Sequence, residues 1–353
     1  MKFGLAAPIE DILADPRYFP VHIDFERDRL TLVETSRDRL THTPFLDGRT
    51  PFAEGIALET SFSEALEARW SIPARPDRFI FHVAFCGSTL LSTFLDIEWK
   101  CFAEREPHIL VELSNAWGKA AASEAEAGLQ LIRNLLRRPW RPGEANVCKP
   151  SNWANTLIPT LVMDPRSIRP LFVTTDKLSY LHSLFRGGRD RMVYVIRAAE
   201  HLLKSAADGS SLWDHATAGV ADPLERAGRI ALVALHLQLR LFEAALSHGG
   251  WGPPHVLTLD EIEADPVAAC LTAAAALDLQ VTERELERSV AARAQRYAKD
   301  PSINYSPEQV AAQNRAIDAE YGVIIHRVLD WAALRGLKGS ITYEMDWDRR
   351  KRA

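Results

Sequence analysis

The chain has 353 residues, which is long enough for one large α/β domain with additional segments or for two modest domains. Its formal net charge of -5 and its isoelectric point near 6.1 give no overall basic field, so nothing points to a nucleic-acid partner. The four cysteines form neither a C-x-x-C pair nor a cluster with histidines, which predicts reduced, mostly buried thiols and no metal site.

Residues 1–60 are expected to form an irregular or small β-rich unit, because scattered Pro, Asp and Arg separate short apolar runs such as YFPVHIDF. The first residues contain acids and prolines where a signal peptide has a longer apolar run. The most apolar long segment is interrupted by His236, Gln238 and Arg240. We therefore expect a cytoplasmic protein with no membrane partner.

A helix is predicted to begin near Ser61, because SFSEALEARW combines a serine cap with a glutamate three residues later. From Arg78 onward, short apolar runs alternate with helical patterns. The expected strands are FIFHVAF, ANVCK, RPLFVTT, RMVYVIR and HVLTLD. The longer expected helices are LQLIRNLLRR, ERAGRIALVALHLQLRLFEAAL, PVAACLTAAAAL, ERELERSVAARAQRY and AAQNRAIDAEYGVIIHRVLDWAALRG. This order predicts an α/β fold over residues 61–340: a three-layer α/β/α sandwich with a parallel sheet, a helical C-terminal part and a tail at 341–353.

The stretch FIFHVAFCGSTLLSTFLD, from Phe79 to Asp96, predicts a buried strand, a tight turn and a helix. Such a turn gathers free backbone N–H groups and the positive end of the helix dipole, so it suits an anion. Gly87 permits close backbone approach, and Ser88 and Thr89 add hydroxyl donors. The ATPase signature G-x-x-x-x-G-K-[ST] is absent, which disfavours a Walker-type nucleotidase; a plain structural turn is the competing interpretation.

The same stretch resembles the donor-binding loop of the sulfotransferase family, in which a basic residue and a Ser-Gly-Thr-like turn lead into a leucine-rich helix. Five consecutive residues match that pattern: Gly87, Ser88, Thr89, Leu90 and Leu91. Cys86 replaces a small serine, and Phe85 stands where the family has its basic residue. The resemblance implies a P-loop type of fold and a loop, Cys86 to Leu90, that holds the 5′-phosphosulfate of 3′-phosphoadenosine 5′-phosphosulfate.

Three further segments resemble the family in the same order along the chain. RMVYVIRAAEHLLKS is similar to the element that holds the donor's 3′-phosphate, with Arg197 and Ser205 at its ligand positions and Ala199 in place of its proline. VCKPSNW resembles a strand that ends in a lysine, here Lys149. CFAEREPHIL carries an acid beside a proline where tyrosylprotein-type members have their general base, and this implies that role for Glu106.

Phe85 removes the cation that should face the phosphosulfate, so another cation must substitute or the ligand differs. Lys149, at the end of a strand expected beside the turn, is the first candidate and is also assigned a catalytic role. Asn152 and Asn155 could line the same rim or cap a helix. Three arginines around a glycine pair, and one lysine near the closing segment, are weaker candidates that fit a solvated loop equally well: Arg186, Arg189, Arg191 and Lys299.

Sulfuryl transfer to a hydroxyl needs a base for the acceptor's proton. Glu106 is favoured by the resemblance, Glu104 and His108 are alternatives, and His82 fits a core position better. Either glutamate could instead pair with an arginine such as Arg105. The sequence thus predicts transfer from 3′-phosphoadenosine 5′-phosphosulfate to a small-molecule or peptide acceptor. The alternative is a non-catalytic relative that binds another phosphorylated ligand. The sequence contains no pattern that identifies the acceptor or the oligomeric state.

Overall fold

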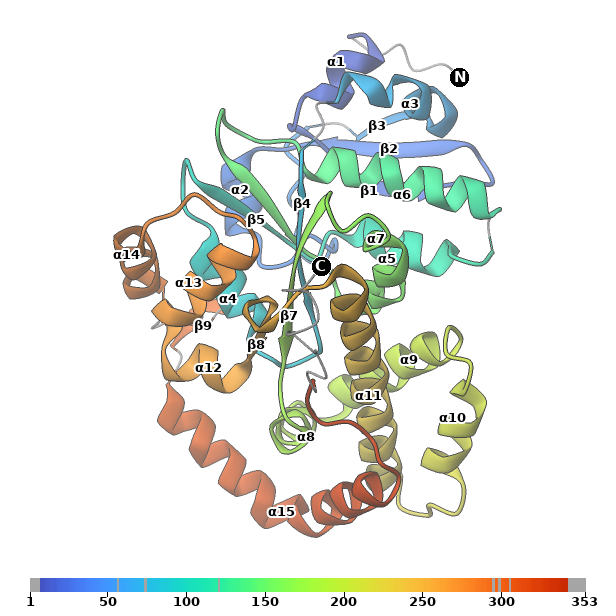
Figure 1. Ribbon diagram of the computed structural model, residues 1–353, viewed down its shortest axis with the longest axis vertical. Coiled ribbons are helices and arrows are strands. Elements are labelled where there is room, and N and C mark those ends of the chain that lie inside the picture. The colour runs from blue at the N-terminus through green and yellow to red at the C-terminus, as the bar shows by residue number, and fades with distance from the viewer. Residues whose placement is uncertain are drawn as a thin grey trace, which may run out of the picture.

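The computed structural model describes residues 7–55, 57–72, 75–119, 121–293, 296–297, 300–304 and 306–341. Its centre is a five-stranded parallel sheet with the spatial order β5-β6-β4-β7-β8 (Figure 1). The strands are β4 (Asp77–His82), β5 (Cys101–Arg105), β6 (Ala145–Lys149), β7 (Ile168–Thr174) and β8 (Val256–Thr258). β4 therefore lies between two strands that come later in the chain. Ligands of open α/β sheets bind at the carboxyl ends of the strands, near such a point.

Helices cover both faces of the sheet (Figure 1). One face carries α4 (Ser88–Leu95), α12 (Leu259–Ala264), α13 (Pro266–Ala276) and α14 (Glu283–Arg293). The other carries α5 (His108–Ala116), α6 (Ala122–Leu136), α7 (Ile158–Leu161) and α11 (Pro223–Gly249). The predicted α/β class, with a parallel sheet between two helical layers, is confirmed.

Aromatic side chains fill the core between the sheet and α11. The rings of Phe79, Phe81 and Phe172 stack in sequence, and Phe172 packs on Phe242 of α11 with ring centroids 5.0 Å apart. By length and composition α11 could cross a membrane, but 72% of its most apolar window is buried inside the protein. A buried core helix passes the same test, because it is apolar on most sides.

The N-terminal residues form a separate antiparallel sheet. Its strands are β1 (Tyr18–Asp24), β2 (Arg29–Glu34) and β3 (Ala57–Ser61), and its helices are α1 (Ile9–Ala14), α2 (Arg37–His42), α3 (Phe62–Ala68) and η1 (Arg69–Ser71). β1 packs on α5 and α6. Ser61 caps α3 by accepting a hydrogen bond from the backbone N–H of Glu64, as the sequence predicts.

Four helices lie beyond the carboxyl ends of β4 and β7, at the bottom of Figure 1. These are α8 (Lys177–Arg186), α9 (Gly188–Leu203), α10 (Gly209–Thr217) and α15 (Pro307–Leu334). The remaining short elements are η2 (Asn152–Leu157), η3 (Pro253–His255), β9 (Arg296–Tyr297) and β10 (Asp300–Asn304). α8 and α15 are joined by Arg186 with Asn314 and by His182 with Asp318. Lys299 and residues 342–353 of the expected tail lie outside the described residues.

Two elements of the predicted sheet are different in the structure. The run RMVYVIR is not a strand but part of α9, because its buried residues Val195, Ala198, Ala199 and Leu202 recur at helical spacing. The fifth strand is instead β5, CFAER. It was not predicted as a strand because two of its five residues, Glu104 and Arg105, are charged. Both are buried: Glu104 accepts a hydrogen bond from Asn146, and Arg105 donates to main-chain carbonyls of residues 40–43.

Candidate functional site

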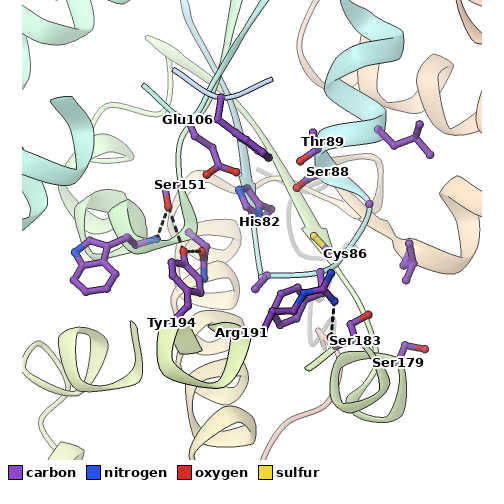
Figure 2. Close-up of a pocket in the computed structure, with 18 of the residues that line it drawn as sticks. His82, Cys86, Ser88, Thr89, Glu106, Ser151, Ser179, Ser183, Arg191 and Tyr194 are labelled. Carbon is purple, nitrogen blue, oxygen red and sulfur yellow. Dashed lines mark hydrogen bonds between the residues drawn. The ribbon is translucent and has the colours of Figure 1, made fainter. Parts of the chain in front are cut away.

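A cavity of about 780 Å³ opens at the carboxyl edge of the sheet (Figure 2). Its walls come from the turn after β4, the chain after β5 and β6, helices α8 and α9, and the beginnings of α12 and α15. These segments are far apart in the sequence and meet because parallel strands end at one edge. Each residue of the turn from Cys86 to Leu90 lines the cavity, so the predicted anion-binding loop is open to a ligand.

The turn between β4 and α4 has an unusual backbone. Phe85 has φ 64° and Gly87 has φ 76°, both in the left-handed region. That region is free of penalty for glycine but costs a bulky residue about 1–2 kcal/mol. A methyl group at Gly87 would also lie 3.0 Å from Leu259. Strain of this kind persists where the surrounding structure fixes it, often at binding sites.

The N-terminus of α4 presents donors to the cavity. The N–H groups of Ser88, Thr89 and Leu90 belong to the first helical turn, which has no earlier carbonyl within the helix to pair with, and the helix dipole adds partial positive charge. Neither the Ser88 nor the Thr89 hydroxyl donates to another described residue, and in Figure 2 both point toward the space that Glu106 also faces. This arrangement can bind a phosphate or sulfate group.

Lys149 and Glu106, the two predicted catalytic residues, form an ion pair with Nζ and Oε1 2.6 Å apart. They sit at the ends of neighbouring strands, since Arg105 of β5 is in register with Lys149 of β6. The Lys149 side chain is 0% exposed and is not among the residues that line the cavity, whereas Glu106 lines it and is 17% exposed. The expectation that Lys149 contacts the ligand is therefore wrong, because its ammonium is buried against Glu106.

Glu106 adopts a left-handed backbone, with φ 57°, and not the extended one expected before Pro107. Its N–H donates to the carbonyl of Lys149, which holds the two strand ends together beyond the regular ladder. The N-terminal loop around Leu46 is held against the same chain segment. The N–H of Leu46 donates to the carbonyl of Arg105, and the N–H of His108 donates to the carbonyl of Leu46. Through these bonds Phe45, Asp47 and Arg49 become part of the cavity wall, which no sequence pattern indicated.

Arg197 and Ser205 do not reach the cavity. The strand that should have ended at Arg197 is helix α9, and Arg197 lies on its exposed side. Ser205 is exposed and donates to the carbonyl of Leu202 at the end of the same helix. Because neither residue lines the cavity, the predicted 3′-phosphate site is wrong at both positions.

Two arginines that the sequence ranked low line the cavity. Arg186, at the end of α8, donates to Asn314 of α15 and to Ser183. Arg191, in the first turns of α9, lies over the ring of Phe85 at 5.1 Å. Arg189 is exposed and does not line the cavity. The only sequence feature that pointed to these arginines was the glycine pair Gly187-Gly188 between them.

A polar network that begins at the partly exposed Tyr194 shapes the side of the cavity next to Glu106. Tyr194 of α9 donates to Asn152, and Asn152 and Asn155 both donate to Gln238 of α11. Burial raises the pKa of Tyr194 to about 12, so the phenol stays protonated. The cap of η2 is Ser151 and not either asparagine. Asn152 lines the cavity and Asn155 does not.

The alternative bases have different surroundings. Glu104 is buried away from the cavity, and burial raises its pKa well above the usual value, so it is structural. His108 lines the cavity and lies 4.0 Å from Glu112. All four cysteines are buried and free, as predicted. Among the described residues, no group of three or more His, Cys, Asp or Glu side chains is placed to hold a metal ion.

His82 is buried beside the Lys149–Glu106 pair, with its ring nitrogens 2.8 and 2.9 Å from the carbonyls of Val83 and Pro150. Both contacts favour the charged ring, but burial and the ammonium of Lys149 outweigh them and lower the pKa of His82 to about 3. The neutral ring therefore donates to one carbonyl only.

This histidine should destabilise the fold in acid. Its pKa is about 3 when folded and about 6.5 when unfolded, so the unfolded chain takes up the proton first as the pH falls. The contribution of His82 to stability is present above pH 6.5 and is lost between there and pH 3, at up to about 1.4 kcal/mol per pH unit. Urea unfolding across this range should show a shallower pH dependence for His82→Gln. Equal slopes for variant and wild type would contradict the assignment.

Comparisons with known proteins add no family to this geometry. Neither a scan against models of protein families nor a search of curated proteins finds a match to the chain. The site must therefore be interpreted from its own residues.

Proposed function

We propose that the protein transfers a sulfuryl group from 3′-phosphoadenosine 5′-phosphosulfate to a hydroxyl or amine acceptor. The observation that carries the proposal is the turn from Cys86 to Leu90, which lines the cavity at the N-terminus of α4. Free hydroxyls and first-turn N–H groups suit the non-bridging oxygens of a phosphosulfate. The residues that would hold this end of the donor are Gly87, Ser88, Thr89 and Leu90.

The second phosphate of this donor has no partner at Arg197 or Ser205. The cavity offers Arg186 in its place, at the junction of α8 and α15. An arginine fork binds phosphate oxygens bidentately, and Asn314 and Ser183 already fix the position of this one. We assign the 3′-phosphate to Arg186.

The chemistry requires one bond to form and one to break. The acceptor oxygen or nitrogen attacks sulfur, the bond from sulfur to the bridging phosphate oxygen breaks, and 3′-phosphoadenosine 5′-phosphate leaves. The acceptor's proton passes to the Glu106 carboxylate, which lines the cavity while Lys149 holds one of its oxygens. Lys149 thus acts as a positioning residue. We assign the acceptor to the part of the cavity that is lined by Phe45, Trp153 and Tyr194.

Calorimetric titration with 3′-phosphoadenosine 5′-phosphate tests the donor site. We expect saturable binding of one nucleotide per chain, with adenosine binding far more weakly because it lacks the phosphates. The double variant Ser88→Ala/Thr89→Ala should weaken nucleotide binding about tenfold or more, since two hydrogen bonds to a charged group are lost. Absence of nucleotide binding by the wild type would contradict the proposal.

Transfer of labelled sulfate from the donor to a panel of phenols, sugars, amines and tyrosine peptides then separates an enzyme from a binding protein. Nucleotide binding without transfer, and without donor hydrolysis, would favour a non-catalytic protein that binds a phosphorylated ligand. The ion pair that occupies both predicted catalytic residues is the observation that keeps this alternative open.

A further inference from the structure

We infer that Arg191 supplies the positive charge that the turn lacks at Phe85, and that Gly187 gives its side chain the room to do so. The inference rests on the proposed function, since it concerns the same anion-binding turn. It assigns a specificity-determining cation to α9, at a position that the sequence offered only as one of its weaker candidates.

The first observation is where Arg191 lies. Its guanidinium carbon is 5.1 Å from the centre of the Phe85 ring, and both residues line the cavity. Figure 2 shows the guanidinium of Arg191 just below the turn, near Cys86. The Phe85 ring is itself supported by Tyr180, with centroids 5.4 Å apart. An arginine that stacks on an aromatic face keeps its N–H donors available in the plane of the group.

The second observation is that Arg191 has donors to spare. One N–H donates to the carbonyl of Ser183 at 2.5 Å, and the guanidinium makes no other hydrogen bond to a described residue. No carboxylate of a described residue lies within 4 Å of it. Arg49, by contrast, is paired with Asp47, and Lys149 is paired with Glu106. Four guanidinium N–H groups of Arg191 are therefore available to a ligand.

The third observation is the acidity of the cavity. Five carboxylates line it, of which Asp47 is paired with Arg49 and Glu106 with Lys149; the other three are Asp190, Asp260 and Glu263. A doubly or triply charged ligand entering such a space is repelled unless a fixed cation lies close to its binding groups. Backbone dipoles alone contribute little against this number of charges. A guanidinium beside the turn offsets that repulsion where the phosphosulfate would lie.

The fourth observation explains why a glycine precedes α9. Gly187 has φ -85°, which every residue tolerates, yet an added methyl group there would overlap with Cγ, Cδ and Nε of Arg191. The side chain of Arg191 thus runs directly over Gly187 on its way to the turn. An alanine at this position keeps the backbone and every charge but displaces the guanidinium.

The test compares four variants of the full chain by calorimetry, with 3′-phosphoadenosine 5′-phosphate and inorganic pyrophosphate as probes. Arg191→Ala should weaken binding of both probes about 10- to 100-fold, because hydrogen bonds to a charged group are lost. Gly187→Ala should weaken binding by a similar factor although no charge changes. Combining the two should add little to Arg191→Ala. Phe85→Lys in the Arg191→Ala background should restore most of the affinity.

Arg189→Ala is the matched control, because it removes the same charge from an exposed position two residues earlier. It should leave both affinities within about twofold. Arg191 also caps the C-terminal turn of α8 through Ser183, and loss of that structural role would lower thermal stability without being rescued by Phe85→Lys.

The outcomes separate the inference from the proposed function. If Ser88→Ala/Thr89→Ala weakens nucleotide binding but Arg191→Ala does not, the inference is overturned and the proposed function stands. If pyrophosphate binds in an Arg191-dependent way but the nucleotide does not bind, the inference stands and the proposed function fails. Failure of the wild type to bind either probe overturns both.

Discussion

Replacing Lys149 with methionine should lower the free energy of unfolding by about 3–5 kcal/mol, as expected when one partner of a buried ion pair is removed. The side chain of Lys149 is completely buried, and its ammonium lies 2.6 Å from Glu106. Methionine fills a similar volume but removes the ammonium that lies against the Glu106 carboxylate, so the loss is electrostatic and not a packing defect. Urea unfolding at neutral pH measures it.

The double variant Lys149→Met/Glu106→Gln is the decisive control. It removes both charges and should be more stable than Lys149→Met alone, since no uncompensated charge remains. Arg197→Met changes the same charge on the exposed side of α9 and should shift stability by less than about 0.5 kcal/mol. A Lys149→Met protein as stable as the wild type would show that the pair is not formed.

Under the proposed function, with Glu106 as the acceptor's base, replacing Glu106 with glutamine should lower the rate of sulfuryl transfer by about 10²–10⁴-fold, the usual contribution of a well-placed general base. Glutamine has nearly the same shape and still offers Lys149 a carbonyl oxygen, so the strand ends should stay together. Affinity for 3′-phosphoadenosine 5′-phosphate should change little, because the turn from Cys86 to Leu90 is untouched. Single-turnover transfer and calorimetry on the same preparation measure the two quantities.

His108→Gln provides the comparison for this prediction, because His108 lines the same cavity and is the other available base. Near-normal turnover of Glu106→Gln together with a large loss in His108→Gln would move the base to the histidine. Loss in both, with nucleotide binding preserved, would indicate that the acceptor's proton passes through a shared path.

The layers of the fold and the turn that leads into α4 could be predicted from local sequence pattern. The strand ending at His82, Gly87 with its two hydroxyl residues, and the start of α4 form one continuous signal in eighteen residues. α9 could not be assigned in this way, because VYVI satisfies the strand pattern and the helical burial of Val195 and Leu202 depends on packing against α11. β-branched residues predict a strand only weakly where tertiary contacts determine whether a segment forms a strand or a helix.

The charges of the site were harder to predict than its backbone. Lys149 and Glu106 are 43 residues apart, and their pairing follows from the register of β5 on β6, a contact that the sequence does not encode locally. Arg191 lies over the ring of Phe85 although it comes from α9, a helix that packs on α8, α11 and η2. Sequence patterns can locate binding residues that lie on one helix, strand or turn. Where side chains from separate elements come together, their positions depend on the topology of the fold.

The main-chain hydrogen bonds around Leu46 make the N-terminal segment a structural part of the cavity. The N–H of Leu46 donates to the carbonyl of Arg105, and the carbonyl of Leu46 accepts from the N–H of His108. The buried guanidinium of Arg105 donates to carbonyls of residues 40–43. In a shortened chain beginning at Ser61, the His108 N–H and the Arg105 guanidinium would lose these carbonyl acceptors, and one wall of the cavity would be missing. The change in composition near residue 60 is therefore a poor place to cut the gene for expression or to splice in another module.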